Sequence, residues 1–387
     1  MKKGNIKSIK VPRPIIAICY DFDKTLSPTD MQAQGYIQSV NYDVKTFWQE
    51  SNDLARKNGM DQNLAYMYKM MDEARGNFIL NREKLEEYGS NVSLYPGVNT
   101  WFENISIYAE QRGAIVEHYV ISSGLKEMIE GTAVAKAGVF KAIYASSFYY
   151  DDRGEVKWPA QVVNFTSKTQ YLFRISKGVL DVNDSDVNDH YEPEDIRIPF
   201  RNIIYIGDSD TDIPCMKVVT MYGGHAIGVY DSTDKDKSKV QKMIRDNRIN
   251  YYAAADYREG SELDVIVKAI IDRTCQNEVL EHMRTKYKRE TADAYDGKTI
   301  EQQKRKDLII ELRSSGSFNS THATVRKLCL IEWNPDEREQ LYRIAVENTQ
   351  VGWILRDPDL RAFYERLLAE ESSLSKAAED IKEAIEE

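Results

Sequence analysis

The amino-acid sequence predicts an α/β protein: a three-layer Rossmann-like core with a parallel sheet, an inserted helical cap and a mainly helical C-terminal extension. Three observations predict this fold class. Four short apolar runs, each followed by a polar or helical stretch, indicate buried strands that alternate with helices. About ninety residues dominated by helix formers lie between the first two runs. From about residue 291 onward, apolar strand-like runs become scarce.

The first of these runs extends from Pro14 to Phe22 and is continuous, as expected for a strand that is buried on both faces. It delivers Asp21 to its C-terminal end. The remaining runs are Val116 to Ile121, Ile203 to Ile206 and Ala226 to Tyr230. Their alternation with helical stretches is typical of a parallel sheet.

The same pattern predicts the domain boundaries. We expect a core made of residues 1–26 and 113–290, a helical cap of residues 27–112, and a helical extension of residues 291–387. Within the cap, an apolar stripe at helical spacing indicates internal packing rather than a ligand-binding face: Leu64, Met67, Tyr68 and Met71.

The extension contains two helix-start signals. Asn334-Pro335 and Asp357-Pro358 each combine an N-cap with a proline at the first helical position. Four aromatic residues can build a small core or an exposed docking face for a protein partner, and we favour the core: Trp333, Tyr342, Trp353 and Phe363.

Composition disfavours several classes of protein. The formal charge of −10 over 387 residues argues against a general nucleic-acid-binding surface. No run approaches the roughly 18 to 20 apolar residues of a membrane span, and the first residues lack a signal-peptide core, so we expect a cytoplasmic protein.

The four cysteines and five histidines lack zinc-ligand spacing. The acidic stretch 181–189 lacks the turn glycine of a calcium loop and is interpreted as a surface loop.

Two acids in the segment from Asp21 to Thr25 predict phosphoryl chemistry. Asp21 can attack phosphorus and form an aspartyl-phosphate, which divides hydrolysis into two displacement steps. Asp23 can protonate the departing alkoxide and then take a proton from water. A turn that merely carries solvated acids is the structural alternative for this short motif.

Two further segments offer groups for a phosphate. Ser122 follows an apolar run directly and can donate a hydrogen bond to a phosphoryl oxygen, with nearby backbone N–H groups adding to the anion site. A helix cap is the alternative interpretation of this serine. Lys168 opens a helical stretch, where its ammonium group can neutralise the phosphate and the nucleophile.

A cluster of acids follows the run that ends at Ile206. Asp208, Asp210 and Asp212 come after a glycine turn, and carboxylates gathered at strand ends repel one another unless a hard cation binds them. Mg²⁺ suits such oxygen ligands. Asp210 and Asp212 can instead cap the helix that starts near Thr211, so the sequence leaves open which of them contacts the metal or its waters.

In this order the DxDxT segment, the serine, the lysine and GDxxxD resemble the haloacid dehalogenase superfamily, and residues 254–261 resemble its closing segment. The resemblance implies Asp21 as nucleophile and Asp23 as general acid/base. It implies Mg²⁺ bound by Asp21, Asp208 and the main-chain carbonyl of Asp23, with Asp212 in the acidic metal motif. It implies phosphate contacts from a further set: Thr25, Ser122, Ser123 and Lys168.

The cap is similar to that of phosphoserine phosphatase-like members, which closes over small phosphorylated molecules. Those enzymes usually carry a glutamate nine residues after the nucleophile to bind the substrate amine, where this sequence has Asp30. Members that attack carbon lack the second acid, so Asp23 argues against dehalogenation.

The expected function is therefore Mg²⁺-dependent hydrolysis of a small phosphorylated metabolite, a phosphomonoester, through an aspartyl-phosphate. Two alternatives stay open. A phosphotransferase or pyrophosphate-cleaving enzyme would use the same nucleophile, and a regulatory protein would bind a partner through its C-terminal helices. The physiological substrate, the oligomeric state and the role of residues 291–387 do not follow from the sequence.

Overall fold

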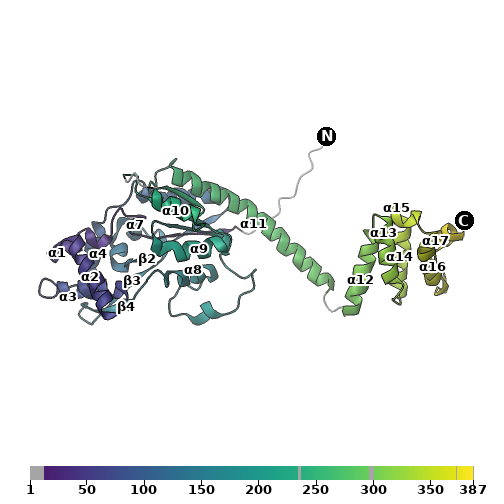
Figure 1. The fold of residues 1–387 in the computed structure, drawn as a ribbon, viewed down its shortest axis with the longest axis horizontal. Coiled ribbons are helices and arrows are strands. Elements are labelled where there is room, and N and C mark those ends of the chain that lie inside the picture. The colour runs from purple at the N-terminus through teal and green to yellow at the C-terminus, as the bar shows by residue number, and fades with distance from the viewer. Residues whose placement is uncertain (1–12, 234–236, 296–299, 372, 387) are drawn as a thin grey trace. The chain divides into compact units, whose positions relative to one another are not determined.

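The computed structural model describes residues 13–233, 237–295, 300–371 and 373–386. The chain divides into two compact units, Met1–Thr285 and Lys286–Glu387. Figure 1 shows the helices and strands of both units.

Unit 1 is built on a seven-stranded sheet with the strand order β4-β3-β2-β1-β5-β6-β7. Neighbouring strands pair in parallel, except for the antiparallel pair β3 and β4 at one edge. The strands are β1 (Ile15–Tyr20), β2 (Ile115–Leu125), β3 (Phe140–Tyr150), β4 (Val156–Gln161), β5 (Ile203–Gly207), β6 (His225–Tyr230) and β7 (Tyr251–Ala254). The predicted α/β fold class is confirmed.

The four predicted strands correspond to β1, β2, β5 and β6, which occupy adjacent positions in the sheet. The other three strands were not predicted. β4 shows why, since it contains Lys157, Pro159 and Gln161 and none of its residues is fully buried. A search for continuous apolar runs finds strands that are covered on both faces and misses those nearer the sheet edges.

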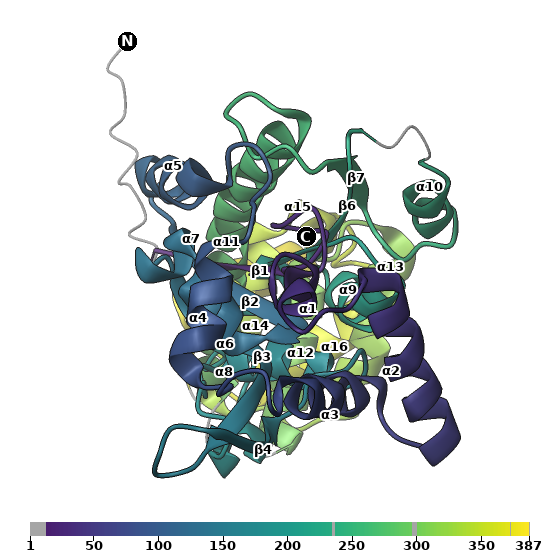
Figure 2. The same cartoon turned by 90° about the vertical axis from the view of Figure 1, so that its left-hand side faces the viewer.

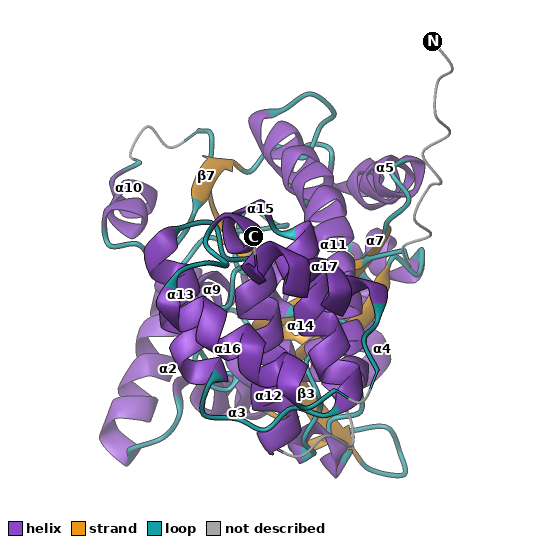
Figure 3. Cartoon of the chain, turned by 90° about the vertical axis from the view of Figure 1, so that its right-hand side faces the viewer, coloured by secondary structure: helices purple, strands orange, loops and turns teal. Residues whose placement is uncertain are grey.

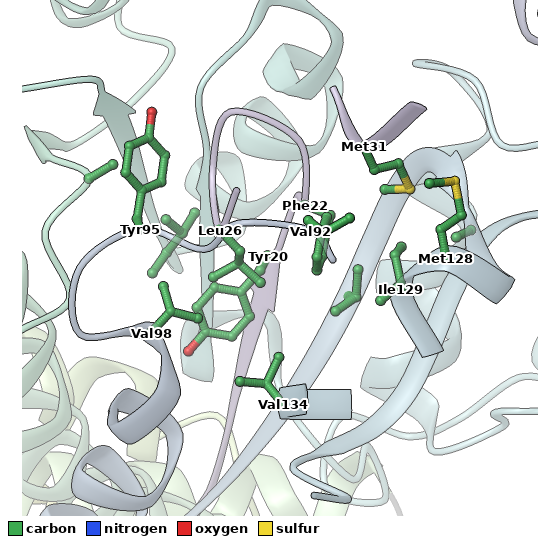
Figure 4. Packing of buried hydrophobic residues seen from close by; sticks show 14 of the residues in the cluster. Tyr20, Phe22, Leu26, Met31, Val92, Tyr95, Val98, Met128, Ile129 and Val134 are labelled. Atoms are coloured by element: carbon green, nitrogen blue, oxygen red, sulfur yellow. The ribbon is translucent and has the colours of Figure 1, made fainter. Parts of the chain in front are cut away.

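Helices cover both faces of the sheet. In β1, Ile16, Ile18 and Tyr20 belong to one apolar cluster, which includes residues of α5 (Val98–Gln111) and α11 (Glu262–Tyr295). Ala17 and Cys19 belong to a second cluster with α8 (Lys168–Lys177) and α9 (Ile213–Met221). This alternation of side chains makes the core a three-layer sandwich. Figure 4 shows the first cluster around Tyr20, Phe22 and Leu26. The other core helices are α6 (Lys126–Gly131), α7 (Ala133–Lys136) and α10 (Ser238–Arg245).

The segment between β1 and α5 is helical and contains α1 (Tyr36–Ser39), α2 (Val44–Asn58), α3 (Gln62–Ala74) and α4 (Arg82–Ser90), preceded by the short 3₁₀ turn Met31–Ala33. Side-chain caps start its longer helices: Asp43 accepts from Thr46 N–H, and Asp61 accepts from Leu64 N–H. Figure 2 shows α2, α3 and α4 in this inserted part. α5, in contrast, packs against β2 and covers the sheet.

The described residues of unit 2 form helices joined by short loops, and none of them lies in a strand (Figure 3). Asn334 and Glu337 form a capping box at the start of α14, as the sequence signal predicts. Trp333, Tyr342 and Phe363 are buried in the core of this unit, whereas Trp353 is 81% exposed, so the expectation of core packing is wrong for Trp353. The helices are α12 (Ile300–Arg313), α13 (Phe318–Leu328), α14 (Pro335–Glu347), α15 (Thr349–Trp353), α16 (Pro358–Ala369) and α17 (Lys376–Glu386).

Among the described residues, none of the helices combines the length and apolar character needed to cross a membrane.

Candidate active site

Asp21 lies directly after β1, at the edge of the sheet where the parallel strands end. Its N–H donates to the carbonyl of Ile206 in the neighbouring strand β5 at 3.0 Å. Its Oδ1 accepts from the N–H of Phe22 at 2.7 Å, and the residue is only 6% exposed. The sheet register therefore fixes both the position and the direction of this carboxylate.

Lys168 is fully buried at the first residue of α8. Its Nζ lies 3.1 Å from Asp21 Oδ2 and 2.8 Å from Asp212 Oδ1. Burial opposes the charge on Lys168, but the two carboxylates outweigh burial and raise its pKa. Lys168 is thus a permanent cation that joins the end of β1 to the acidic turn after β5.

Asp212 is also fully buried. Besides the ammonium of Lys168, its Oδ1 accepts from the Tyr205 hydroxyl at 2.9 Å, and its Oδ2 accepts from the N–H and hydroxyl of Ser209, both at 3.2 Å. A Cβ on Gly207 would come within 2.6 Å of Asp212 Oδ2. The glycine of the GDxxxD segment is therefore needed because the turn folds the carboxylate back over it.

Asp208, Asp21 and Asp212 each offer a carboxylate oxygen within 4.8 Å of the others. Burial, and then the charges of Asp212 and Asp21, raise the pKa of Asp208. Lys239 Nζ lies 3.5 Å from Asp208 Oδ2, so the three acids face two ammonium groups and keep an excess of negative charge. Hard oxygen donors are the ligands that Mg²⁺ prefers. This donor set fits Mg²⁺. Asp210, in contrast, is exposed, so Asp212 rather than Asp210 belongs to the cluster.

Asp23 lies two residues beyond Asp21 and accepts from the N–H of Met31 at 2.8 Å. Met31 is the first residue of the 3₁₀ turn in the inserted segment. The main chain of the cap therefore holds this carboxylate. Burial, followed by the charges of Asp30 and Asp21, raises the pKa of Asp23 and favours its protonated form.

Ser122 and Gly124 lie in the last residues of β2, where the pairing with β3 shifts register between Ile121 and Leu125. The Ser122 hydroxyl accepts from Gly124 N–H at 3.1 Å, and Ser122 is 1% exposed. A Cβ on Gly124 would clash with Met31 Cε and would lie 3.1 Å from Asp23 Oδ2. The C-terminal end of β2 therefore approaches Asp23 closely. Thr25 is buried as well, and its hydroxyl has no hydrogen-bond partner in the described part of the chain.

The carbonyl of Ser123 accepts from two hydroxyls, that of Tyr66 at 2.8 Å and that of Ser146 at 3.2 Å. Sequence reasoning missed both donors. Tyr66 stands beside the apolar stripe of the cap and carries no motif, and Ser146 lies in β3, a strand that was not predicted. Both donors are far from Ser123 in the sequence, so only the folded structure shows that they contact it.

The predicted residues thus fall into two adjacent groups. One contains the acids and the buried cation: Asp21, Lys168, Asp208 and Asp212. The other lies at the C-terminal end of β2: Asp23, Ser122 and Ser123, with Gly124 beside them. Thr25 lies two residues after Asp23, and its carbonyl accepts from the Tyr257 hydroxyl at 2.8 Å.

The sequence pattern of the haloacid dehalogenase-like hydrolases matches residues 18–217, and the chain belongs to this family. An uncharacterised protein of Borreliella burgdorferi is 29% identical over 275 residues, which cover 64% of this chain and 94% of that protein.

Solved structures give weaker matches. A HAD family hydrolase from Salmonella enterica serovar Typhi has a TM-score of 0.45 at 14% identity, over 67% of this chain and 72% of that one. A phospho-aspartyl intermediate analogue of phosphoserine phosphatase has a TM-score of 0.41 at 15% identity, over 66% and 99%. Cytosolic 5'-nucleotidase IIIB bound to cytidine has a TM-score of 0.41 at 16% identity, over 70% and 88%.

Proposed function

We propose that this hydrolase is a Mg²⁺-dependent phosphatase that cleaves a small phosphomonoester through an aspartyl-phosphate on Asp21. One observation carries the proposal: the Asp21 carboxylate lies at a strand end within reach of a buried ammonium and two further carboxylates, with a second acid two residues on. This arrangement supplies a nucleophile, a cation, metal ligands and a proton donor in one place.

In the first step Asp21 forms a bond to phosphorus while the ester oxygen leaves, and Asp23 gives its proton to that oxygen. In the second step Asp23 takes a proton from water, water oxygen bonds to phosphorus, and the Asp21 carboxylate leaves. Lys168, Ser122 and the backbone near Ser123 stabilise the phosphoryl oxygens. Asp21, Asp208 and the Asp23 carbonyl would hold Mg²⁺, with Asp212 nearby; the ion screens charge between the nucleophile and the phosphate.

The substrate is proposed to differ from phosphoserine, although the sequence of the cap resembles that of phosphoserine phosphatase-like members. Asp30 Oδ1 lies 2.9 Å from Lys24 Nζ, so its charge is already matched within the chain. A carboxylate that is paired in this way is a poor acceptor for a substrate amine. A phosphotransferase with the same nucleophile remains the alternative, and transfer to an added alcohol would identify it.

Phosphate release from a panel of phosphomonoesters tests the function, with Mg²⁺ and with chelator. We expect Mg²⁺-dependent turnover that falls at least about 1,000-fold in Asp21→Asn, because the amide cannot act as nucleophile. Asp152→Asn, which changes an exposed acid in the β3–β4 turn, is the matched control and should keep wild-type turnover. Equal turnover in Asp21→Asn and wild type, or none in the folded wild type, would refute the proposal.

We also propose that the C-terminal helices bind a protein partner in the cytoplasm. Leu330 and Trp353 are 87% and 81% exposed, the highest values among the large apolar side chains of the described residues, and each offers apolar area to a partner. The four cysteines are free, as thiols are in a reducing compartment.

A further inference from the structure

The hydroxyl of Tyr66 reaches from the cap helix α3 to the C-terminal end of β2, which carries Ser122. Tyr66 is 4% exposed, and it donates to the carbonyl of Ser123 at 2.8 Å. Its ring packs edge-on against Trp48 of α2, with ring centroids 5.7 Å apart. The phenol ring is therefore held by the cap, while its hydroxyl is bonded to the end of β2.

The first turn of α3 reaches a second core loop. Asn63 Nδ2 donates to the carbonyl of Val163 at 2.8 Å, and Asn164 Nδ2 donates to Asp61 Oδ2 at 3.0 Å. The carbonyl of Asn164 in turn accepts from the N–H of Lys168 at 3.0 Å. One turn of the cap helix is thus bonded to the loop that starts α8 and places the buried ammonium.

Ser146 of β3 is hydrogen-bonded both to the end of β2 and to the loop before α8. Its hydroxyl donates to the Ser123 carbonyl at 3.2 Å and accepts from the N–H of Val163 at 3.1 Å. Asn63 and Tyr66 are three residues apart, which puts them on one face of α3. The hydrogen bonds therefore close a ring, which runs from Tyr66 through Ser123, Ser146 and Val163 to Asn63 and returns along α3.

We propose that Tyr66 and Asn63 are positioning residues: through this ring, α3 holds the end of β2 around Ser122 and the loop before Lys168 in the mutual arrangement that phosphoryl transfer needs. Neither residue is assigned a contact with substrate. The expected effect on catalysis rests on the proposed phosphatase function. The mechanical link from α3 to the end of β2 and to the loop before Lys168 does not. α3 is also in contact with β4 (Figure 2), so the cap helix that carries the ring packs on the edge strand of the sheet.

Tyr66→Phe removes one hydroxyl and keeps the ring that packs on Trp48. With p-nitrophenyl phosphate and Mg²⁺, we expect kcat to fall about 10- to 100-fold, because misplaced groups lose transition-state stabilisation. KM should stay within about threefold, since ground-state binding is not removed. Tyr68→Phe is the matched control, because Tyr68 lies on the same helix, is 44% exposed and should keep wild-type kinetics.

Amide hydrogen exchange measures the mechanical link without activity. Tyr66→Phe should speed exchange in residues 163–168 as well as 122–125, although the hydrogen bond that it removes is to Ser123. Asn63→Leu should speed exchange in residues 122–125 as well as 163–168, although the hydrogen bond that it removes is to Val163. The two substitutions together should lower kcat by less than the product of their separate effects, because both open the same ring.

The outcomes separate the inference from the function. Unchanged kcat and unchanged exchange in Tyr66→Phe would overturn the inference and leave the phosphatase intact. A rise in KM at constant kcat would make Tyr66 a substrate contact and would also overturn it. If the wild type released no phosphate from any ester, the proposed function would fail. Hydrogen exchange in residues 122–125 and 163–168 would still decide whether α3 holds these two segments.

Discussion

Tyr20, the residue before the proposed nucleophile, takes part in a buried chain of hydrogen bonds. Trp101 Nε1 donates to the Tyr20 hydroxyl at 2.8 Å, and that hydroxyl lies 3.0 Å from His118 Nδ1. Because the tyrosine oxygen already accepts from tryptophan, its own hydrogen is free for Nδ1. The opposite nitrogen, Nε2, lies 3.2 Å from the Phe102 carbonyl and is suited to donate to it. A neutral imidazole satisfies every group in this chain.

Burial lowers the pKa of His118 to about 4, and the side chain is 3% exposed. In the unfolded chain the pKa is near 6.5, so between about pH 6.5 and 4 the unfolded state binds more protons than the folded state. The stability contributed by neutral His118 is complete above about pH 6.5 and is lost as the pH falls to about 4, by about 3 kcal/mol in all.

His118→Gln keeps an acceptor and a donor but cannot titrate. The difference in unfolding free energy between wild type and His118→Gln, measured with urea from pH 4 to 7.5, should therefore shrink as the pH falls, by up to about 3 kcal/mol. Other titrating groups cancel in this difference. A difference that stayed constant with pH would show that His118 does not change its protonation in this range.

At the scale of single elements, α4 and α6 pack with their backbones in contact through two glycines. A Cβ on Gly89 of α4 would overlap the carbonyl of Met128 in α6, and a Cβ on Gly131 of α6 would overlap the carbonyl of Glu86 in α4. The contact is reciprocal, so neither helix can shift to accept a methyl group without leaving the other. α6 directly follows β2, so this crossing anchors the strand end that carries Ser122.

Gly89→Ala should lower the unfolding free energy by about 2–4 kcal/mol, because overpacking of backbone against backbone outweighs the gain of about 1 kcal/mol in helix propensity. Urea unfolding measures the change. Ser90→Ala, at the exposed neighbouring position, should change stability by less than about 0.5 kcal/mol. A Gly89→Ala protein more stable than wild type would mean that the two helices are not in close contact.

Elements also differ in how far the sequence predicts them. β1, β2, β5 and β6 were predicted because a strand covered on both faces is apolar throughout, and the acids after β1 and β5 were expected to meet because parallel strands end at one edge. The predicted cluster of Asp21, Lys168, Asp208 and Asp212 is found, while its catalytic roles stay predictions.

The ring of hydrogen bonds could not be predicted in this way. Tyr66 and Ser123 are 57 positions apart, and Asn63 and Val163 are 100 apart. Their donors are ordinary side chains without a motif, and each bond depends on how the cap packs on the sheet. Local periodicity contains no signal for such pairs.

At the scale of the whole molecule, the two units have separate apolar cores. The core of unit 2 is formed by residues from Leu308 to Ile385, and it includes Trp333, Tyr342 and Phe363. The proposed catalytic residues all lie in unit 1. Catalysis on small esters should therefore not depend on unit 2.

Two variants test this independence. A chain that ends at Tyr295, the last residue of α11, should hydrolyse small phosphomonoesters with kcat and KM within about twofold of the full chain, because compact units with their own cores can fold alone.

In the full chain, Phe363→Ala should destabilise unit 2 by about 3–5 kcal/mol, because it opens a cavity at a residue that is 1% exposed. Turnover should again be unchanged. Calorimetry and steady-state kinetics measure both effects. Loss of turnover in both variants would show that unit 2 supports the catalytic unit, whereas retained turnover in both would leave unit 2 for partner binding.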